Sequence, residues 1–236
     1  RCATGSPLIS GPFSRMSDWW TYRLEDFLLF SPRVYWRMFE LHNARFWPLH
    51  LATLGAGIAA VFAMPRRTHG ASILTALVLA ALWIFVGWSF LWDRYMAINW
   101  AIAYAVPAFA LEALLLAVAA GRGGLVFDRT DIAARAGLLL AAFGLVVYPL
   151  LAPIFGRPWA RAEVFGIAPD PTAMVTLGLV LSARSRLLPL LLPVPIAWLL
   201  LGGLTLHAMG DPQGWIPLLT AGAVVVVLMV RGTKSS

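Results

Sequence analysis

Residues 71–92 read ASILTALVLAALWIFVGWSFLW and contain no charged side chain. A helix of this length rises about 33 Å, which covers the roughly 30 Å of hydrocarbon in a bilayer. Inside that hydrocarbon every backbone polar group must be bonded within the chain, and a helix meets this condition. The stretch therefore predicts a transmembrane helix and an all-α membrane protein.

Apolar segments continue on both sides of this stretch. They lie at residues 48–64, 97–119, 136–155, 171–183, 187–208 and 215–230. The first and the last are long enough to span if their ends are trimmed or the bilayer thins locally. The composition of the 236 residues agrees, with 60% hydrophobic and 12% charged residues and a mean hydropathy of +0.79. We predict a polytopic α-helical membrane protein of about seven spans in a lipid bilayer, one of them short or broken; a six-span alternative stays open.

The chain divides into three parts. Residues 1–15 lack the continuous apolar core of a signal peptide and precede Met16, so we expect a disordered or non-native leader. Residues 16–45 show apolar side chains at helical spacing, and Ser31 followed by Pro32 is typical of a helix start. We expect interfacial amphipathic helices there and a transmembrane bundle over residues 46–236. The interfacial helices would either cap the bundle or dock a membrane protein partner through residues 17–45.

The basic side chains set the predicted orientation. The net charge is +7, but the cations are spread over short loops, which indicates membrane topology and argues against a nucleic-acid partner. Loops on one side of the seven-span arrangement carry Arg66, Arg67, Arg122, Arg129, Arg135, Arg184, Arg186, Arg231 and Lys234. That side is expected to be cytoplasmic, with the N-terminus outside, the C-terminus inside and the protein in a bacterial inner membrane.

The irregular stretch 148–172 reads YPLLAPIFGRPWARAEVFGIAPDPT. Its prolines should kink or stop the preceding helix. Asp170 as N-cap and Pro171 at the first helical position should then open the short segment 171–183. Thirteen residues of helix extend only about 20 Å, so that helix must begin within protein or beside a water-filled cavity.

Broken helices of this kind form substrate sites in secondary transporters, where helix N-termini attract anions. We therefore predict a site for a small anionic solute. Its candidate substrate-binding residues are Tyr148, Arg157, Arg161, Asp170 and Thr172. The alternative is an extracytoplasmic loop packed over the bundle, with its arginines held by Glu163 and Asp170.

Glu112 is the acidic residue that lies well inside a predicted span, at 97–119. A carboxylate at that depth is costly unless it is protonated, paired or hydrated. We predict a proton-coupling role for Glu112; the alternative is a pairing with Arg135, whose side chain could reach towards it.

The sequence contains none of the common motifs for catalysis, nucleotide binding or metal binding. It contains no phosphate-binding loop, nucleophile elbow, dinucleotide motif or cysteine cluster, and its four histidines show no metal-binding spacing. We expect no cofactor and no metal, and a non-enzyme is favoured over an intramembrane enzyme. The two leading interpretations are transport or binding of a small solute, and a non-catalytic membrane subunit or assembly factor.

Several positions carry a family resemblance. These are Ile98 and Asn99, Tyr148 to Leu151, Gly156, Phe165 and Gly166, Pro169, Pro171 and Thr172, Pro195, Trp198, Gly202 and Gly203, and Gly210 before Asp211. In their order and spacing the chain resembles a family of bacterial polytopic membrane proteins of unknown function, some of them labelled automatically as transporter permeases. Relatives often have histidine near position 157 and cysteine near position 170. The Arg157 and Asp170 found here imply a charged site in place of a metal site.

Overall fold

The structure is a computed structural model that describes residues 28–63, 68–127, 132–184 and 187–233. The expected leader and the first part of the expected interfacial region lie outside these residues. Apart from two short strands, the described chain is helical, which confirms the all-α prediction.

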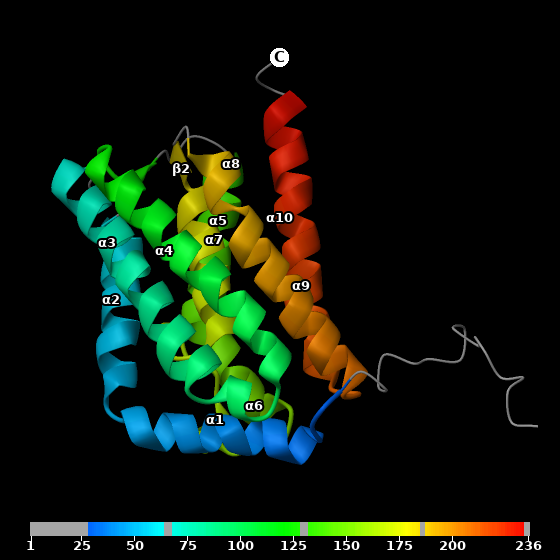
Figure 1. The fold of residues 1–236 in the computed structure, drawn as a ribbon. Coiled ribbons are helices and arrows are strands. Elements are labelled where there is room, and N and C mark those ends of the chain that lie inside the picture. The colour runs from blue at the N-terminus through cyan, green and yellow to red at the C-terminus, as the bar shows by residue number, and fades with distance from the viewer. Residues whose placement is uncertain (1–27, 64–67, 128–131, 185–186, 234–236) are drawn as a thin grey trace, which may run out of the picture.

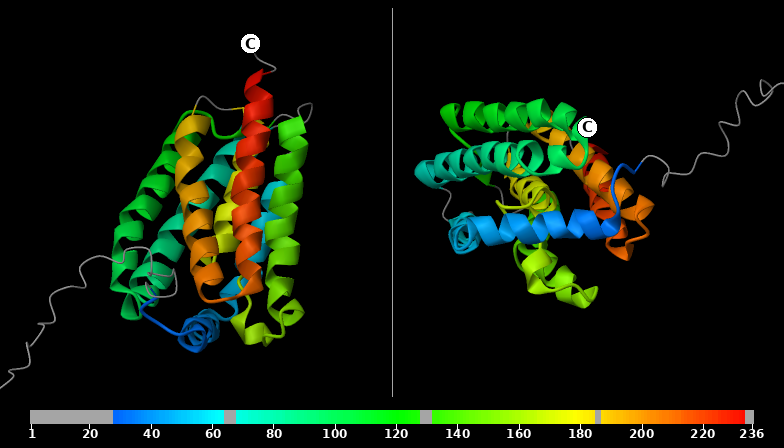
Figure 2. Two further views of the ribbon diagram at one scale, coloured as in Figure 1. Left: turned by 90° about the vertical axis from the view of Figure 1, so that its right-hand side faces the viewer. Right: turned by 60° about the horizontal axis from the view of Figure 1, so that its bottom comes forward.

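Helix α1 (Pro32–Phe46) crosses one end of the helical bundle (Figure 1; Figure 2, right). It starts where Ser31 and Pro32 predict, with the Ser31 hydroxyl accepting a hydrogen bond from the Val34 amide. The chain then turns by 88° into α2 (Leu49–Ala63). One face of α1 is buried through Tyr35, Trp36, Met38, Phe39 and His42. This face packs α1 against the bundle.

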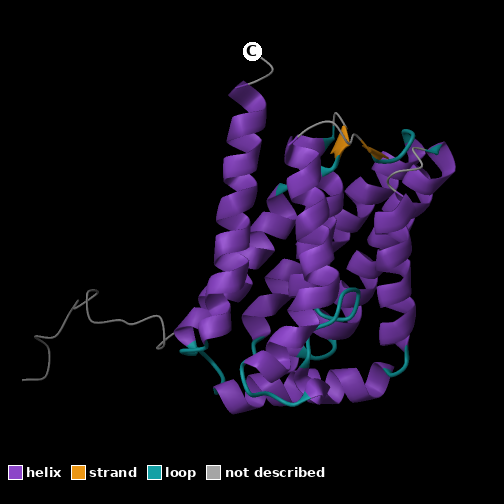
Figure 3. Cartoon of the chain, turned by 180° about the vertical axis from the view of Figure 1, so that it is seen from behind, coloured by secondary structure: helices purple, strands orange, loops and turns teal. Residues whose placement is uncertain are grey.

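The remaining elements alternate between the α1 end and the opposite end, where the C-terminal helix finishes (Figure 1). The longer helices are α3 (His69–Val86), α4 (Val106–Gly121), α5 (Ile132–Ala142), α7 (Pro169–Leu181), α9 (Pro193–Ala208) and α10 (Trp215–Thr233). Short helical pieces extend or connect them: η4 (Gly87–Trp92), η5 (Tyr95–Ala97), η6 (Trp100–Ala105), η7 (Phe143–Val147), η8 (Tyr148–Leu150), α6 (Leu151–Ile154), η9 (Trp159–Arg161), α8 (Leu188–Leu191) and η10 (Pro212–Gly214). Strands β1 (Val126–Phe127) and β2 (Ala183–Arg184) pair antiparallel at the end away from α1 (Figure 3).

Five helical stretches in the described residues are long and apolar enough to cross a membrane. They are His69–Ala97, Trp100–Gly121, Ile132–Ile154, Leu188–Ala208 and Pro212–Val230. The bent pair α1 and α2 would make a sixth. These helices confirm a protein suited to a lipid bilayer. Their lengths do not establish the predicted count of seven, because α2 has 15 residues and α7 has 13.

Helix α7 is enclosed by the rest of the bundle, and each of its residues from Pro169 to Leu181 is buried. Its backbone lies against that of α5, since a Cβ atom on Gly178 would come within 2.5 Å of the Gly137 oxygen and of the Ala141 nitrogen. Small residues permit such close approach of apolar helices. The short helix predicted from residues 171–183 is therefore an interior helix of the bundle.

Candidate functional site

The segment between α6 and α7 folds back into the protein. Its residues from Ala162 to Ala168 are buried, and Gly166 adopts a positive φ of 75°. A side chain at Gly166 would also meet the Thr53 Cβ atom at 2.8 Å. Glycine is therefore required at this turn by both backbone conformation and space.

Thr172 closes the start of α7. Its hydroxyl accepts a hydrogen bond from the Gly166 amide at 2.8 Å and donates one to the Ala168 carbonyl at 2.6 Å. Asp170 is the second residue of the helix and Ala168 occupies the cap position, so the prediction that Asp170 caps the helix is wrong. Asp170 still places a carboxyl group in the first turn, where the helix dipole favours negative charge.

Asp170 is held by two other elements and is only 2% exposed. The Tyr148 hydroxyl donates a hydrogen bond of 3.0 Å to Oδ2, and the Trp198 indole nitrogen donates one of 2.7 Å to Oδ1. Gly202 leaves room for this carboxyl group, because a Cβ atom there would lie 2.8 Å from Oδ1. The structure thus brings the predicted residues Tyr148, Asp170 and Thr172 together at the start of α7.

Arg157 belongs to an adjoining polar cluster. Its guanidinium lies 3.7 Å from the centre of the Trp36 ring and forms an ion pair of 2.7 Å with Asp211. It also donates a hydrogen bond to the side-chain oxygen of Gln213, whose amide donates one of 2.5 Å to Glu163. This cluster ties α1, the segment before α7 and the turn before α10 to one another.

Glu163 is the most unusual member of the cluster, at 3% exposure. Its Oε1 atom has no hydrogen-bond partner among the described residues. Burial raises the pKa of Glu163 well above its usual range, the nearby Asp170 raises it further, and Arg157 opposes the shift. The carboxyl group is therefore favoured in its protonated form. We refer to Tyr148, Arg157, Glu163, Asp170, Thr172, Trp198, Asp211 and Gln213 as the α7 network.

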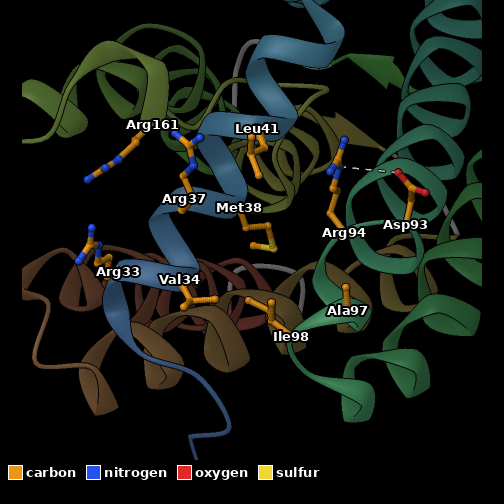
Figure 4. A pocket seen from close by; sticks show the side chains of 10 residues that line it. All are labelled: Arg33, Val34, Arg37, Met38, Leu41, Asp93, Arg94, Ala97, Ile98 and Arg161. Atoms are coloured by element: carbon orange, nitrogen blue, oxygen red, sulfur yellow. Dashed lines mark ion pairs between the residues drawn. The ribbon is translucent and has the colours of Figure 1, made fainter.

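Arg161 lies apart from the α7 network. Its guanidinium forms an ion pair of 3.4 Å with Glu40 of α1 and lines a pocket of about 510 Å³. Three more arginines line this pocket, together with one aspartate and five apolar residues (Figure 4): Arg33, Arg37, Arg94, Asp93, Val34, Met38, Leu41, Ala97 and Ile98. We call this the arginine pocket. The two arginines of the predicted site are therefore separated: Arg157 belongs to the α7 network and Arg161 to the arginine pocket.

Glu112 is completely buried in α4. Neither carboxylate oxygen has a hydrogen-bond partner in the described part of the chain. Arg135 is exposed, and no ion pair joins it to Glu112 there. One helical turn away, Phe109 packs edge-on against Trp198 with ring centres 5.0 Å apart. Phe109 thus contacts Trp198, the residue whose indole nitrogen donates to Asp170.

Sequence reasoning missed Trp198 and Gln213 as members of the site and treated Glu163 as a counter-ion. Gln213 is fully buried, and its partner Glu163 is distant in sequence. The apolar neighbours of Glu163 in the run Ala162 to Ile167 were the available signal that this carboxyl group is buried. Across the described residues, no group of three or more histidine, cysteine, aspartate or glutamate side chains is placed to hold a metal ion.

The fold and the site together define an α-helical protein whose apolar helices are long enough to cross a bilayer. These helices surround a short interior helix, α7, with an aspartate in its first turn. The chain belongs to DUF6064, a family of unknown function whose model matches residues 32–236. No curated protein and no solved structure matches the chain. The matched region starts with α1 and includes both the α7 network and the arginine pocket.

Proposed function

We propose that this protein resides in a bacterial inner membrane, binds a small anionic solute and moves it across the bilayer. The observation that carries the proposal is α7, an interior helix of 13 residues whose start is surrounded by buried charged and polar side chains. Secondary transporters use short and broken helices at their binding sites.

The solute would first meet the arginine pocket, where Arg161 lies, and then the start of α7. The α7 network is closely packed, and its hydrogen bonds join Tyr148, Asp170 and Thr172 to neighbouring groups. For the solute to pass, the hydrogen bond between Tyr148 and Asp170 would have to break. Arg157 would also have to release Asp211 and bind the solute. Alternating rearrangement around a fixed central site is the usual way in which transporters of this kind work.

Glu112 would couple transport to protons. An unpaired carboxyl group buried in a membrane helix is costly and is usually retained for a role. Glu112 lies three residues after Phe109, which packs against Trp198, and Trp198 donates to Asp170. In this proposal these side chains transmit a change in the protonation of Glu112 to Asp170.

We further propose seven crossings, made by α2, α3, α4, α5 with α6, α7, α9 and α10, with α7 shielded from lipid. The α1 end would face outwards, so that α1 lies in the membrane interface and the C-terminus is cytoplasmic. Exposed tryptophans support an interface at the α1 end, where aromatic belts form. They are Trp47, Trp92, Trp100, Trp159 and Trp215.

A second candidate is a non-catalytic membrane subunit or assembly factor that docks a partner through residues 17–45. It is favoured by the exposed apolar side chains of α1, of which Val34 is 43% and Leu41 is 44% exposed.

Flux into proteoliposomes separates the two candidates. We expect the wild type to take up radiolabelled phosphate or sulfate faster than empty liposomes, and Glu112→Gln and Arg157→Lys to lower uptake at least tenfold. Arg135→Gln is the matched control, because Arg135 is exposed and remote from α1. Circular dichroism and thermal unfolding establish that each variant is folded. Silent substitutions, together with loss of a co-purifying complex on deletion of residues 17–45, would establish the second candidate and overturn the first.

A further inference from the structure

We propose that the arginine pocket binds a phosphate group carried by an amphiphile, such as the head group of an anionic phospholipid. The inference rests on the proposed function, because it names the kind of anion that the α1 end receives.

Counting only the residues that the structure describes, the charge of the pocket is partly neutralised. Arg37 and Arg161 share a single carboxylate, Glu40, at 2.5 and 3.4 Å. Arg94 shares Asp93 with Arg45, which lies outside the lining. Two carboxylates thus serve four guanidinium groups.

Arg33 adds a further cation, and no ion pair joins it to another residue in the described ranges. Guanidinium groups donate pairs of hydrogen bonds whose geometry fits phosphate oxygens. The pocket can therefore receive a phosphate group without breaking the ion pairs that it already has.

The apolar lining lies beside the cationic lining. Figure 4 shows Arg33, Arg37 and Arg161 on one side of α1. Ala97 and Ile98 lie on the other side, together with the Arg94–Asp93 ion pair. Val34, Met38 and Leu41 of α1 complete the apolar part. An inorganic anion would leave this part uncovered, whereas an amphiphile would cover both parts. A volume of about 510 Å³ is also in the range of pockets that hold organic ligands.

On the proposed topology, the pocket lies at the depth where phospholipid phosphates occur. Its segment Asp93–Ile98 is flanked by the exposed Trp92 and Trp100. Exposed tryptophans mark the head-group level of a membrane. A phospholipid could therefore enter the pocket sideways, with its chains still in the bilayer.

The test measures binding to the full chain in non-ionic detergent by titration calorimetry. The probes are dioctanoyl phosphatidylglycerol, dioctanoyl phosphatidylcholine and inorganic phosphate. We expect phosphatidylglycerol to bind at least tenfold more tightly than either of the others. Arg33→Gln with Arg161→Gln should weaken its binding at least tenfold, and Arg122→Gln with Arg135→Gln, at the opposite end, should leave it unchanged.

Each other outcome is decisive. Equal binding of phosphate and phosphatidylglycerol would overturn the amphiphile and leave the proposed anion transport standing. Equal binding of the two lipids would show a general lipid surface and overturn the inference. Absence of any binding would overturn both the inference and the proposed solute site. If the double variant does not fold, Arg33→Gln alone supplies the test, because Arg33 is exposed, and a loss of at least threefold is then expected.

Discussion

The indole nitrogen of Trp198 donates a hydrogen bond of 2.7 Å to the carboxyl group of Asp170, which joins α9 to the first turn of α7. Both side chains are buried, so the partner of each group is fixed by the fold. A buried carboxyl group that loses a donor suffers the full cost of its desolvation. This contact is therefore expected to hold the interior helix in place.

Replacement of the indole tests this expectation. Trp198→Phe keeps an aromatic ring and removes the donor, so we expect a loss of about 2 kcal/mol in the free energy of unfolding. Trp100→Phe is the control, since Trp100 is exposed and should tolerate the change. Denaturant unfolding in detergent, followed by circular dichroism, measures both. Equal stability of the two variants would show that the bond to Asp170 is unimportant.

The space beside Asp170 gives a second prediction. A methyl group at Gly202 would come within 2.8 Å of Oδ1 of Asp170, so Gly202→Ala should destabilise the protein by about 1–3 kcal/mol. Gly222 lies in α10 with nothing within 4 Å of the same added atom. Gly222→Ala should therefore be neutral or slightly stabilising, because alanine favours a helix. Thermal unfolding of the two variants measures the difference in stability. If Gly202→Ala is as stable as the wild type, α9 can move away from α7.

Glu163 makes stability depend on pH. Since the pKa of Glu163 is raised by burial, the folded chain retains a proton that the unfolded chain loses above the ordinary glutamate range. The contribution of Glu163 to stability is therefore largest at acidic pH and falls as the pH rises towards the raised pKa. Glu163→Gln keeps an acceptor for Gln213 and removes the titration.

We expect Glu163→Gln to raise the melting temperature at pH 8 and to leave it nearly unchanged at pH 4.5. Melting curves across this range, compared with those of the wild type, provide the measurement. A variant that follows the wild type at every pH would show that Glu163 ionises freely in the folded protein.

Glu40 limits the charge of the arginine pocket, because it pairs with both Arg37 and Arg161. Glu40→Gln should free these guanidinium groups and tighten the binding of phosphatidylglycerol about threefold at low salt. The gain should shrink as salt is added, since exposed charges are screened. Calorimetry at two salt concentrations measures it. Weaker binding by the variant would show that Glu40 orients the arginines and does not compete with the ligand.

The main helices could be predicted because apolar length is a local property. Residues 71–92 lie within α3 and η4, and the short segment 171–183 appears as α7. Pro149 and Pro153 predict a bend or a stop in the helix, and the chain there passes from π-helical η7 through η8 to α6. The short length of α7 also indicated correctly that it begins within protein.

The contacts of the site could be predicted only in part, because they join residues far apart in sequence. Trp198 lies 28 positions from Asp170, and Gln213 lies 50 positions from Glu163. No local spacing shows which donors reach a carboxyl group. The separation of Arg157 from Arg161 depends on the turn at η9, which directs one arginine to Asp211 and the other to Glu40.

Anion-driven proton movement is the direct test of transport coupled to Glu112. Proteoliposomes that contain a pH-sensitive dye are given an external pulse of phosphate or sulfate, with the wild type and Glu112→Gln prepared in parallel. We expect the internal pH to change with the wild type and to stay constant with Glu112→Gln, although both are folded. Wild-type liposomes that respond no more than protein-free liposomes would contradict it.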